Sequence, residues 1–261
     1  MRNGCEEGER CVDETAKERM AFAVACEAAA NTLRGQNGIG SLGEKTLHLA
    51  LKYFYEPNAE NHERPLQGYV ADAFGERGVV EIQTAQTWRL KPKLAAFLPV
   101  SDVLVVCPLA KEKWVIWVDP VSGSIGEKRR SPGSAKPLAA VGELYGLKEF
   151  LLMPGFSVEL VLLSVEEYRL LDGYGEQKKK RATKYEKLPT ALHARIRLQT
   201  PADYAALLPE GLPERFTSKD LKMLAKLRLP EAQKALNVLF TLGAVTRVDK
   251  QGNTYFYQRC L

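Results

Sequence analysis

Two carboxylates and one amide, those of Asp72, Glu81 and Gln83, are the groups in this sequence whose types and spacing suggest shared chemistry. Glu81 and Gln83 are two residues apart in an extended run, so the alternation of side chains along a strand puts both on one face. Two carboxylates at the edge of neighbouring strands can hold Mg²⁺, because this ion prefers oxygen ligands and keeps several waters. A bound Mg²⁺ can generate a hydroxide nucleophile and stabilise the leaving oxygen of a phosphodiester. We therefore expect Asp72 and Glu81 to bind Mg²⁺ or Mn²⁺, and Gln83 to orient water.

Four local elements predicted from the sequence would position these residues. They are strands at 67–74 and 79–84, which a turn at 75–78 joins, a helix at 90–98 and a strand at 103–107. The turn would bring Asp72 within a few ångströms of Glu81. Pro92 falls near the first turn of the helix, where proline is tolerated. The last run is continuously apolar, which is typical of a strand buried on both faces.

Two more helices are predicted before the hairpin, at 13–33 and from residue 41 to about residue 55. The apolar residues at helical spacing in the first are Met20, Ala21, Val24 and Ala28. Those that share a face of the second are Leu47, Leu51 and Phe54.

The remaining pattern predicts an α/β fold with a mixed sheet. The further elements are strands at 114–118 and 158–164, a loop at 119–137 and a helix at 165–171. We expect three parts: an α/β core with its N-terminal helix at 1–172, a basic linker at 173–212 and a small C-terminal domain at 213–261.

The order of these residues and elements resembles the PD-(D/E)xK nuclease superfamily. The similar features are a helix carrying Glu44, a strand with Asp72, the sequence Glu-Ile-Gln at 81–83, and then a helix and a buried strand. The resemblance covers residues 41–107. It implies a restriction-endonuclease-like fold and a Mg²⁺-dependent nuclease, in which Asp72 and Glu81 bind the metal and Glu44 is an accessory catalytic carboxylate.

The sequence departs from this superfamily at Gln83, where the family has a lysine that assists the attacking water. Some subfamilies are similar in carrying Glu-x-Gln. Glutamine has no charge and cannot act as a general base, although it can orient water by hydrogen bonding. Arg89, Lys91 or Lys93 of the following helix could supply the missing charge. If none of them reaches the site, the core is catalytically inactive.

Each acidic residue also has a structural interpretation. Glu44 stands three residues after a serine, which is the spacing of a capping box. Asp72 could hydrogen-bond its own turn. Glu81 lies in an otherwise apolar strand, where a charge is costly unless it is paired or metal-bound. A salt bridge to Lys45 or Lys93 is therefore the alternative to a metal ion.

The C-terminal residues 213–261 resemble a winged helix, with helices at 219–227 and 231–242 before a hairpin of strands at 245–248 and 254–257. In such modules the second helix enters the major groove of DNA and the hairpin touches the backbone. The residues expected to contact DNA are Gln233, Lys234 and Asn237 on the helix, and Arg247, Lys250 and Gln251 on the wing. Contact with a protein partner is the alternative.

Positive charge is concentrated in residues 176–197, which carry a net charge of +6 against +5 for the whole chain. A local basic patch attracts a polyanion, while the alternative is a solvated loop. The basic residues expected to bind nucleic acid here are Lys178, Lys179, Lys180 and Arg181. A second basic loop, at 128–132, has the same two interpretations.

The bulk composition excludes several classes. Five cysteines without a CxxC pair argue against a disulfide framework and a structural zinc site. No window approaches the ~18 consecutive apolar residues of a membrane helix. The acidic, polar start at 1–15 is unlike a signal peptide. We therefore expect a cytoplasmic protein without a membrane partner.

Three functions stay open on the sequence. The first is a Mg²⁺-dependent DNA nuclease, and the second is a non-catalytic DNA-binding or regulatory protein on a degenerate nuclease fold. The third is a protein-interaction scaffold. The expected partner is DNA, and the alternatives are a second copy of the chain and a protein bound through the winged helix.

Overall fold

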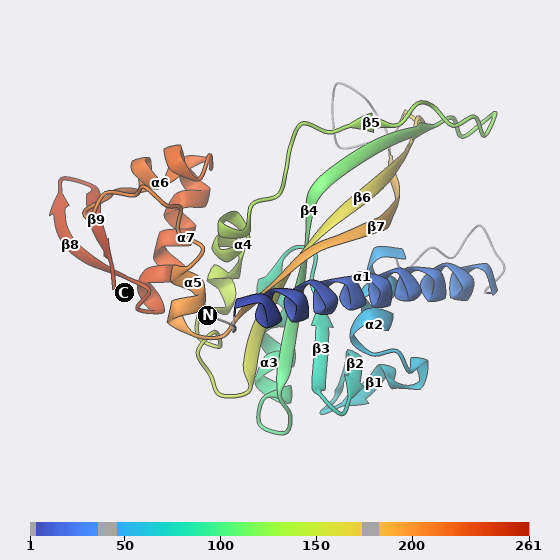
Figure 1. Ribbon diagram of the computed structural model, residues 1–261, viewed down its shortest axis with the longest axis horizontal. Coiled ribbons are helices and arrows are strands. Elements are labelled where there is room, and N and C mark those ends of the chain that lie inside the picture. Colours follow the sequence, from blue (N-terminus) through green and yellow to red (C-terminus); the bar gives the residue numbers. More distant parts are fainter. Residues whose placement is uncertain (1–3, 36–45, 174–182, 261) are drawn as a thin grey trace. The chain divides into compact units, whose positions relative to one another are not determined.

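The computed structural model describes residues 4–35, 46–173 and 183–260 (Figure 1). The helices are α1 (Gly4–Gly35), α2 (Thr46–Tyr55), α3 (Lys91–Phe97), α4 (Pro137–Glu143), α5 (Pro201–Ala205), α6 (Ser218–Leu224) and α7 (Leu229–Thr241), with 3₁₀ turns η1 (Ala59–Asn61), η2 (Thr87–Leu90) and η3 (Leu144–Leu147). The strands are β1 (His62–Leu66), β2 (Tyr69–Gly75), β3 (Gly78–Ile82), β4 (Val103–Val118), β5 (Arg129–Arg130), β6 (Phe156–Leu170), β7 (Thr183–Leu198), β8 (Val245–Gln251) and β9 (Thr254–Arg259). No helix within these stretches is long and apolar enough to span a bilayer.

The predicted α/β class with a mixed sheet is confirmed. Within the described stretches the large sheet has seven strands in the order β1-β2-β3-β4-β6-β7, with β5 paired to β4, and β8 and β9 form a separate hairpin. The contacts divide the described residues into two units. Within the described stretches, the first draws on residues up to His62, on Ala110–Ser134 and on residues between Leu162 and Ala194, and the second on Glu63–Leu109, Ala135–Val161 and residues from Arg195 onward. Each unit is thus assembled from three separate stretches of the chain.

In the first unit, α1 and α2 pack against each other. Phe22 and Ala29 of α1 are buried, and the ring of Phe22 meets that of Phe54 edge-on with centroids 5.4 Å apart. Met20 and Val24, which we expected on the apolar face, are 72% and 60% exposed, so the predicted face was wrong. In an alanine-rich helix several rows of apolar side chains have helical spacing, and the packing of the partner helix determines which row is buried.

Helix α2 buries the side chains that the sequence predicted. Leu47 and Leu51 are buried, and Phe54 is half-buried. The backbone N–H of Thr46 donates to the Glu186 Oε1 atom of β7 at 3.1 Å. Helices therefore flank the sheet on the part of β7 that belongs to this unit.

In the second unit, a hairpin and a crossover build the predicted arrangement. β2 pairs with β3 antiparallel, and β3 pairs with β4 parallel, with α3 in the connection between them. Phe97 of α3 is buried, and its ring lies 6.2 Å from that of Tyr69 on β2. Val105 and Val106 point to opposite faces of β4 and are both fully buried. This confirms that the run at 103–107 is covered on both sides.

Residues 165–171 were expected to be helical, and this prediction was wrong because β6 continues to Leu170. Glu167 lies buried on this strand, within 3.7 Å of Lys113 on β4 and paired with Arg169. Burial raises the pKa of Glu167, but the hydrogen bond from Arg169 and the charge of Lys113 lower it to below its usual value. Pairing between distant strands has overridden the local helix propensity.

The expected linker at 173–212 contains β7, so for residues 183–198 the prediction was wrong. Arg195 and Arg197 each lie 3.2 Å from a carboxylate oxygen of Glu159, which is buried on the neighbouring strand β6. Two of the charges of the basic segment, those of Arg195 and Arg197, therefore belong to cross-strand ion pairs.

The C-terminal residues form the predicted order of two helices and a hairpin. Thr217 caps α6, accepting from the backbone N–H groups of Lys219 and Asp220. Gly243, with a φ of +72°, follows the end of α7. α7 also packs against α4, which the sequence had not predicted.

Candidate functional site

The β2–β3 hairpin brings Asp72 and Glu81 together. Its register pairs Ala73 with Val80. Asp72 precedes Ala73 and Glu81 follows Val80, so the two acidic residues stand opposite each other at the next position of the hairpin. The backbone N–H of Asp72 donates to Glu81 Oε1 at 3.4 Å, and the N–H of Ile82 donates to Asp72 Oδ2 at 2.7 Å. The predicted proximity of Asp72 and Glu81 is therefore confirmed.

A single glycine makes this hairpin possible. Gly78 has a φ of +92°, and a Cβ atom on it would lie 2.5 Å from the carbonyl oxygen of Asp102. Other residues would meet both backbone strain and a clash with main-chain atoms. The register that places Glu81 beside Asp72 thus depends on Gly78.

Glu81 is a buried carboxylate, only 1% exposed. Lys93 Nζ donates to its Oε1 atom at 3.0 Å and to its Oε2 atom at 2.9 Å. Burial and the negative charge of Asp72 raise the pKa of Glu81, and Lys93 lowers it, so that the pKa is about 7. Near neutral pH the protonated and ionised forms of this carboxyl group are therefore both populated, whereas a glutamate with the usual pKa would be fully ionised.

Of the three basic residues considered for the missing lysine, Lys93 is the one that contacts Glu81. Lys91 pairs with Glu149 at 2.7 Å, and Arg89 lies over a neighbouring aromatic ring. The salt bridge between Glu81 and Lys93, which the sequence offered as the alternative to a metal, is present.

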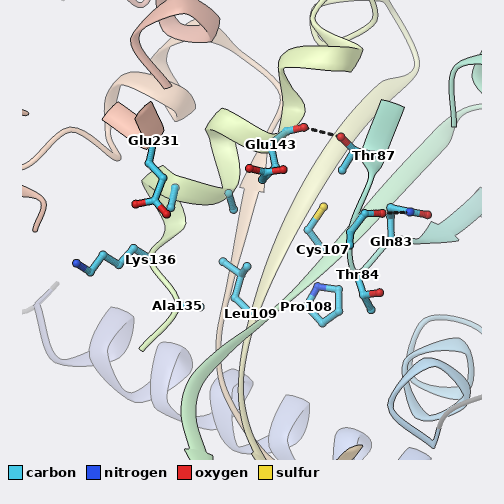
Figure 2. A pocket seen from close by; sticks show the side chains of 13 residues that line it. Gln83, Thr84, Thr87, Cys107, Pro108, Leu109, Ala135, Lys136, Glu143 and Glu231 are labelled. Carbon is cyan, nitrogen blue, oxygen red and sulfur yellow. Dashed lines mark hydrogen bonds between the residues drawn. The ribbon is translucent and has the colours of Figure 1, made fainter. Parts of the chain in front are cut away.

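Gln83 lies at the lining of a cleft with a volume of about 220 Å³ (Figure 2). Its amide donates to the carbonyl oxygen of Ala85. Neither Asp72 nor Glu81 lines the cleft. The other polar or charged side chains of its lining include Thr84, Thr87, Cys107, Lys136, Glu143 and Glu231. Burial raises the pKa of the Cys107 thiol to about 12, so it is not a nucleophile at neutral pH.

The expected accessory carboxylate, Glu44, lies outside the described residues, as does Lys45. Among the side chains that the structure does place, no group of three or more His, Cys, Asp or Glu is arranged to hold a metal ion. The described candidate metal ligands are thus the pair Asp72 and Glu81.

Residues 45–199 match the family described as a domain of unknown function, DUF8091. This chain belongs to the DUF8091 family. In this DUF8091 protein the matched region spans α2 to β7 and includes Asp72, Glu81 and Lys93, whereas α5 to β9 follow it.

An uncharacterized protein of Treponema pallidum (strain Nichols) is similar to this DUF8091 protein. The two are 26% identical over 222 residues, which cover 85% of this chain and 87% of the relative. No solved structure matches the chain.

Beyond the DUF8091 region, α7 carries three of the expected DNA contacts. Gln233 is exposed and Asn237 is half-buried. Lys234 lies beside α4: a Cβ atom on Gly142 would be 3.2 Å from Lys234 Cβ, and Lys234 Nζ is 3.7 Å from Glu143 Oε1. Helix α4 therefore occupies space next to Lys234 that a groove-binding helix would need.

The hairpin β8–β9 holds the other expected contacts. The guanidinium carbon of Arg247 lies 4.1 Å from the ring centroid of Phe240 and 4.2 Å from that of Tyr255. Arg247 is half-buried in this sandwich, while Lys250 and Gln251 are exposed. The sandwich fixes the guanidinium and leaves Lys250 as the more accessible cation.

The basic segments of the DUF8091 region are only partly described. Lys178, Lys179, Lys180 and Arg181 lie outside the described residues. In the second basic loop, Lys128 pairs with Glu166 at 2.5 Å and Arg130 with Glu112 at 2.9 Å. These pairs neutralise part of the positive charge of residues 128–132.

One polar cluster in the first unit was not predicted from the sequence. Ser164 Oγ lies 2.7 Å from His193 Nε2 and donates to Glu112 Oε2 at 3.2 Å. The residues come from three strands, so only strand pairing unites them.

Proposed function

We propose that this DUF8091 protein is a metal-dependent nuclease that hydrolyses phosphodiester bonds of DNA on a restriction-endonuclease-like core. The element order supports the proposal, because α2, β1 to β3, α3 and β4 follow one another as the PD-(D/E)xK resemblance implies. Asp72 on β2 and Glu81 on β3 stand where that resemblance expects the acidic residues.

The observation that carries the proposal is the contact between Lys93 and Glu81. The resemblance implies a lysine at the position of Gln83, and glutamine cannot supply its charge. Lys93 Nζ, from α3, lies within 3.0 Å of both carboxylate oxygens of Glu81. An ammonium group there can donate to a phosphate oxygen or a water beside the carboxylates.

The donor set fits Mg²⁺ or Mn²⁺. Asp72 and Glu81 would hold the ion through carboxylate oxygens, which such cations prefer. When bound, it would supply a hydroxide nucleophile and stabilise the leaving oxygen. The N–H of Ile82 orients the Asp72 carboxylate at 2.7 Å, and Lys93 orients that of Glu81.

In this proposal the C-terminal module, as a winged helix, contributes to holding DNA. Gln233 and Asn237 would contact it from the side of α7 away from Gly142, and Lys250 would contact phosphates from the hairpin. Phosphate contacts of this kind add affinity without sequence preference.

The test combines metal binding with cleavage. Titration calorimetry with Mn²⁺ should give heat with the wild type and none with folded Asp72→Asn, and the same variant should not cleave DNA in Mg²⁺. Glu149→Gln is the matched control, because it makes the same acid-to-amide change in the exposed ion pair with Lys91. Cleavage that persists in Asp72→Asn would rule out this site.

The second candidate is a non-catalytic DNA-binding protein on a degenerate nuclease fold. The same ion pair favours it, because Lys93 already occupies both oxygens of a carboxylate that is 1% exposed. It predicts DNA binding that is the same with and without Mg²⁺, and the same in Asp72→Asn as in the wild type.

A further inference from the structure

In the second unit, the 3₁₀ turns η2 and η3 lie against each other, and each presents an exposed aromatic ring with a positive charge beside it. Trp88 is 57% exposed and Tyr145 is 44% exposed. The guanidinium carbon of Arg89 lies 5.5 Å from the Trp88 ring centroid, and Lys148 Nζ lies 4.6 Å from the Tyr145 ring centroid. We call these four residues the Trp88–Tyr145 surface. Two large rings that reach solvent beside cations offer faces on which a flat, negatively charged ligand can stack.

The backbone that presents Trp88 is fixed in place. A Cβ atom on Gly146 would lie 2.6 Å from Trp88 Cβ, so this glycine lets η2 and η3 approach closely. Thr87 Oγ1 donates to the carbonyl oxygen of Glu143 at the end of α4 (Figure 2). A ring held on a tied segment loses little conformational entropy when a ligand stacks on it.

The same stretch of chain leads to the candidate metal site. α3 follows η2 directly, and Lys93 comes five residues after Trp88, about 8–10 Å along the helical axis. Thr87, next to Trp88, lines the cleft together with Gln83. The cleft, at about 220 Å³, is smaller than the ~300–1,000 Å³ of sites for drug-sized ligands, so it suits a single ring system.

We infer that the Trp88–Tyr145 surface binds single-stranded DNA, so that the nuclease acts on single strands or unpaired ends. The reaction part of this inference rests on the proposed function, whereas the binding part does not. Successive bases of a single strand can stack on the rings, and Arg89 and Lys148 can meet its phosphates. A duplex keeps its base faces inside the stack and can use only the charges. Cations beside both rings favour a polyanion over an apolar protein segment.

The test is binding of a labelled oligothymidylate and of a duplex of the same length, by fluorescence anisotropy in a buffer with a chelator. The chelator prevents cleavage, so binding is measured alone. Trp88→Ala should weaken single-strand binding by about 10- to 100-fold, the usual effect of losing one stacking ring. Duplex binding should change little, and Trp88→Phe should restore most of the lost affinity.

Two controls separate stacking from general effects. Leu152→Ala removes another exposed apolar side chain of the same unit, 46% exposed, and should leave both affinities unchanged. Arg89→Gln should lower the salt dependence of binding by about one unit of slope if it meets a phosphate.

The outcomes distinguish this inference from the proposed nuclease activity. Equal binding of duplex and single strand, with no effect of Trp88→Ala, would overturn the inference even if Mg²⁺-dependent cleavage were found. No nucleic acid binding at all would also overturn it and would leave a protein partner for this surface. Single-strand binding that needs Trp88, without any cleavage in Mg²⁺, would support the inference and overturn only the nuclease.

Discussion

Replacing Lys93 by methionine would leave the carboxylate of Glu81 buried without its positive partner. Lys93 Nζ lies 2.9 Å from Glu81 Oε2, and the side chains are 26% and 2% exposed. Removing one partner of a buried ion pair costs about 3–5 kcal/mol, and the partial exposure of Lys93 puts the expected loss near 3 kcal/mol. For a chain of this size that is a fall of roughly 6–12 °C in Tm.

The pKa of Glu81 determines how this loss depends on pH. Folding raises the pKa of Glu81 from 4.5 to about 7, so the folded protein binds this proton more tightly than the unfolded chain does. The free energy of unfolding of the wild type therefore falls as pH rises from about 4.5 to about 7. Without Lys93 the carboxyl pKa rises further, so the fall is larger and extends to higher pH. At about pH 4.5 and below, where the folded carboxyl is protonated with or without Lys93, the substitution should cost little.

Urea unfolding at about pH 8.5 and about pH 5.5 tests this reasoning. Lys93→Met should lose about 3 kcal/mol at the higher pH and much less at the lower one, and adding Glu81→Gln should restore most of the loss. Lys91→Met is the control, because its pair with Glu149 is exposed and should be worth less than about 1 kcal/mol. An unchanged free energy of unfolding in Lys93→Met, or an equal loss at both pH values, would refute the assigned ion pair.

Three further predictions concern the elements around the site. Gly78→Ala should destabilise the fold by at least about 2 kcal/mol in urea unfolding, because φ is +92° and the new Cβ would meet Asp102 O at 2.5 Å; a stable variant would contradict this. Thr217→Val should cost about 1 kcal/mol by losing the cap of α6, measured in the same way. In the native protein a thiol reagent should label Cys260, which is exposed, and should spare Cys107, because burial raises the pKa of that thiol to about 12. Mass spectrometry identifies the labelled site. Rapid labelling of Cys107 would contradict the prediction and show that β4 opens.

The local elements around the site could be predicted from the sequence because their signals span only a few residues. Alternation and a turn indicated the hairpin that holds Asp72 and Glu81, and a continuous apolar run indicated the buried part of β4. The caps and turn glycines likewise indicated the two helices and the hairpin after Thr217.

Long strands could not be predicted in this way. Residues 165–170 and 183–198 carry charges that favour a helix or a loop locally, yet they are strands of the large sheet. Glu167 on β6 is paired with Lys113 on β4, and Glu159 on β6 is paired with Arg195 and Arg197 on β7. Such pairing joins residues that are far apart in sequence, so no local pattern contains it.

The sequence by itself determined the chemical groups of this protein. They are two acidic residues on neighbouring strands, a glutamine where the similar nuclease superfamily has a lysine, and three basic residues in the segment that follows. Only the tertiary structure decided that Lys93, and neither Arg89 nor Lys91, meets Glu81. It also decided that Trp88 stays in solvent on a segment fixed against Gly146. The physical reason is that spacing sets which side chains share a face, while the packing of a helix on its sheet sets which of them are buried and paired.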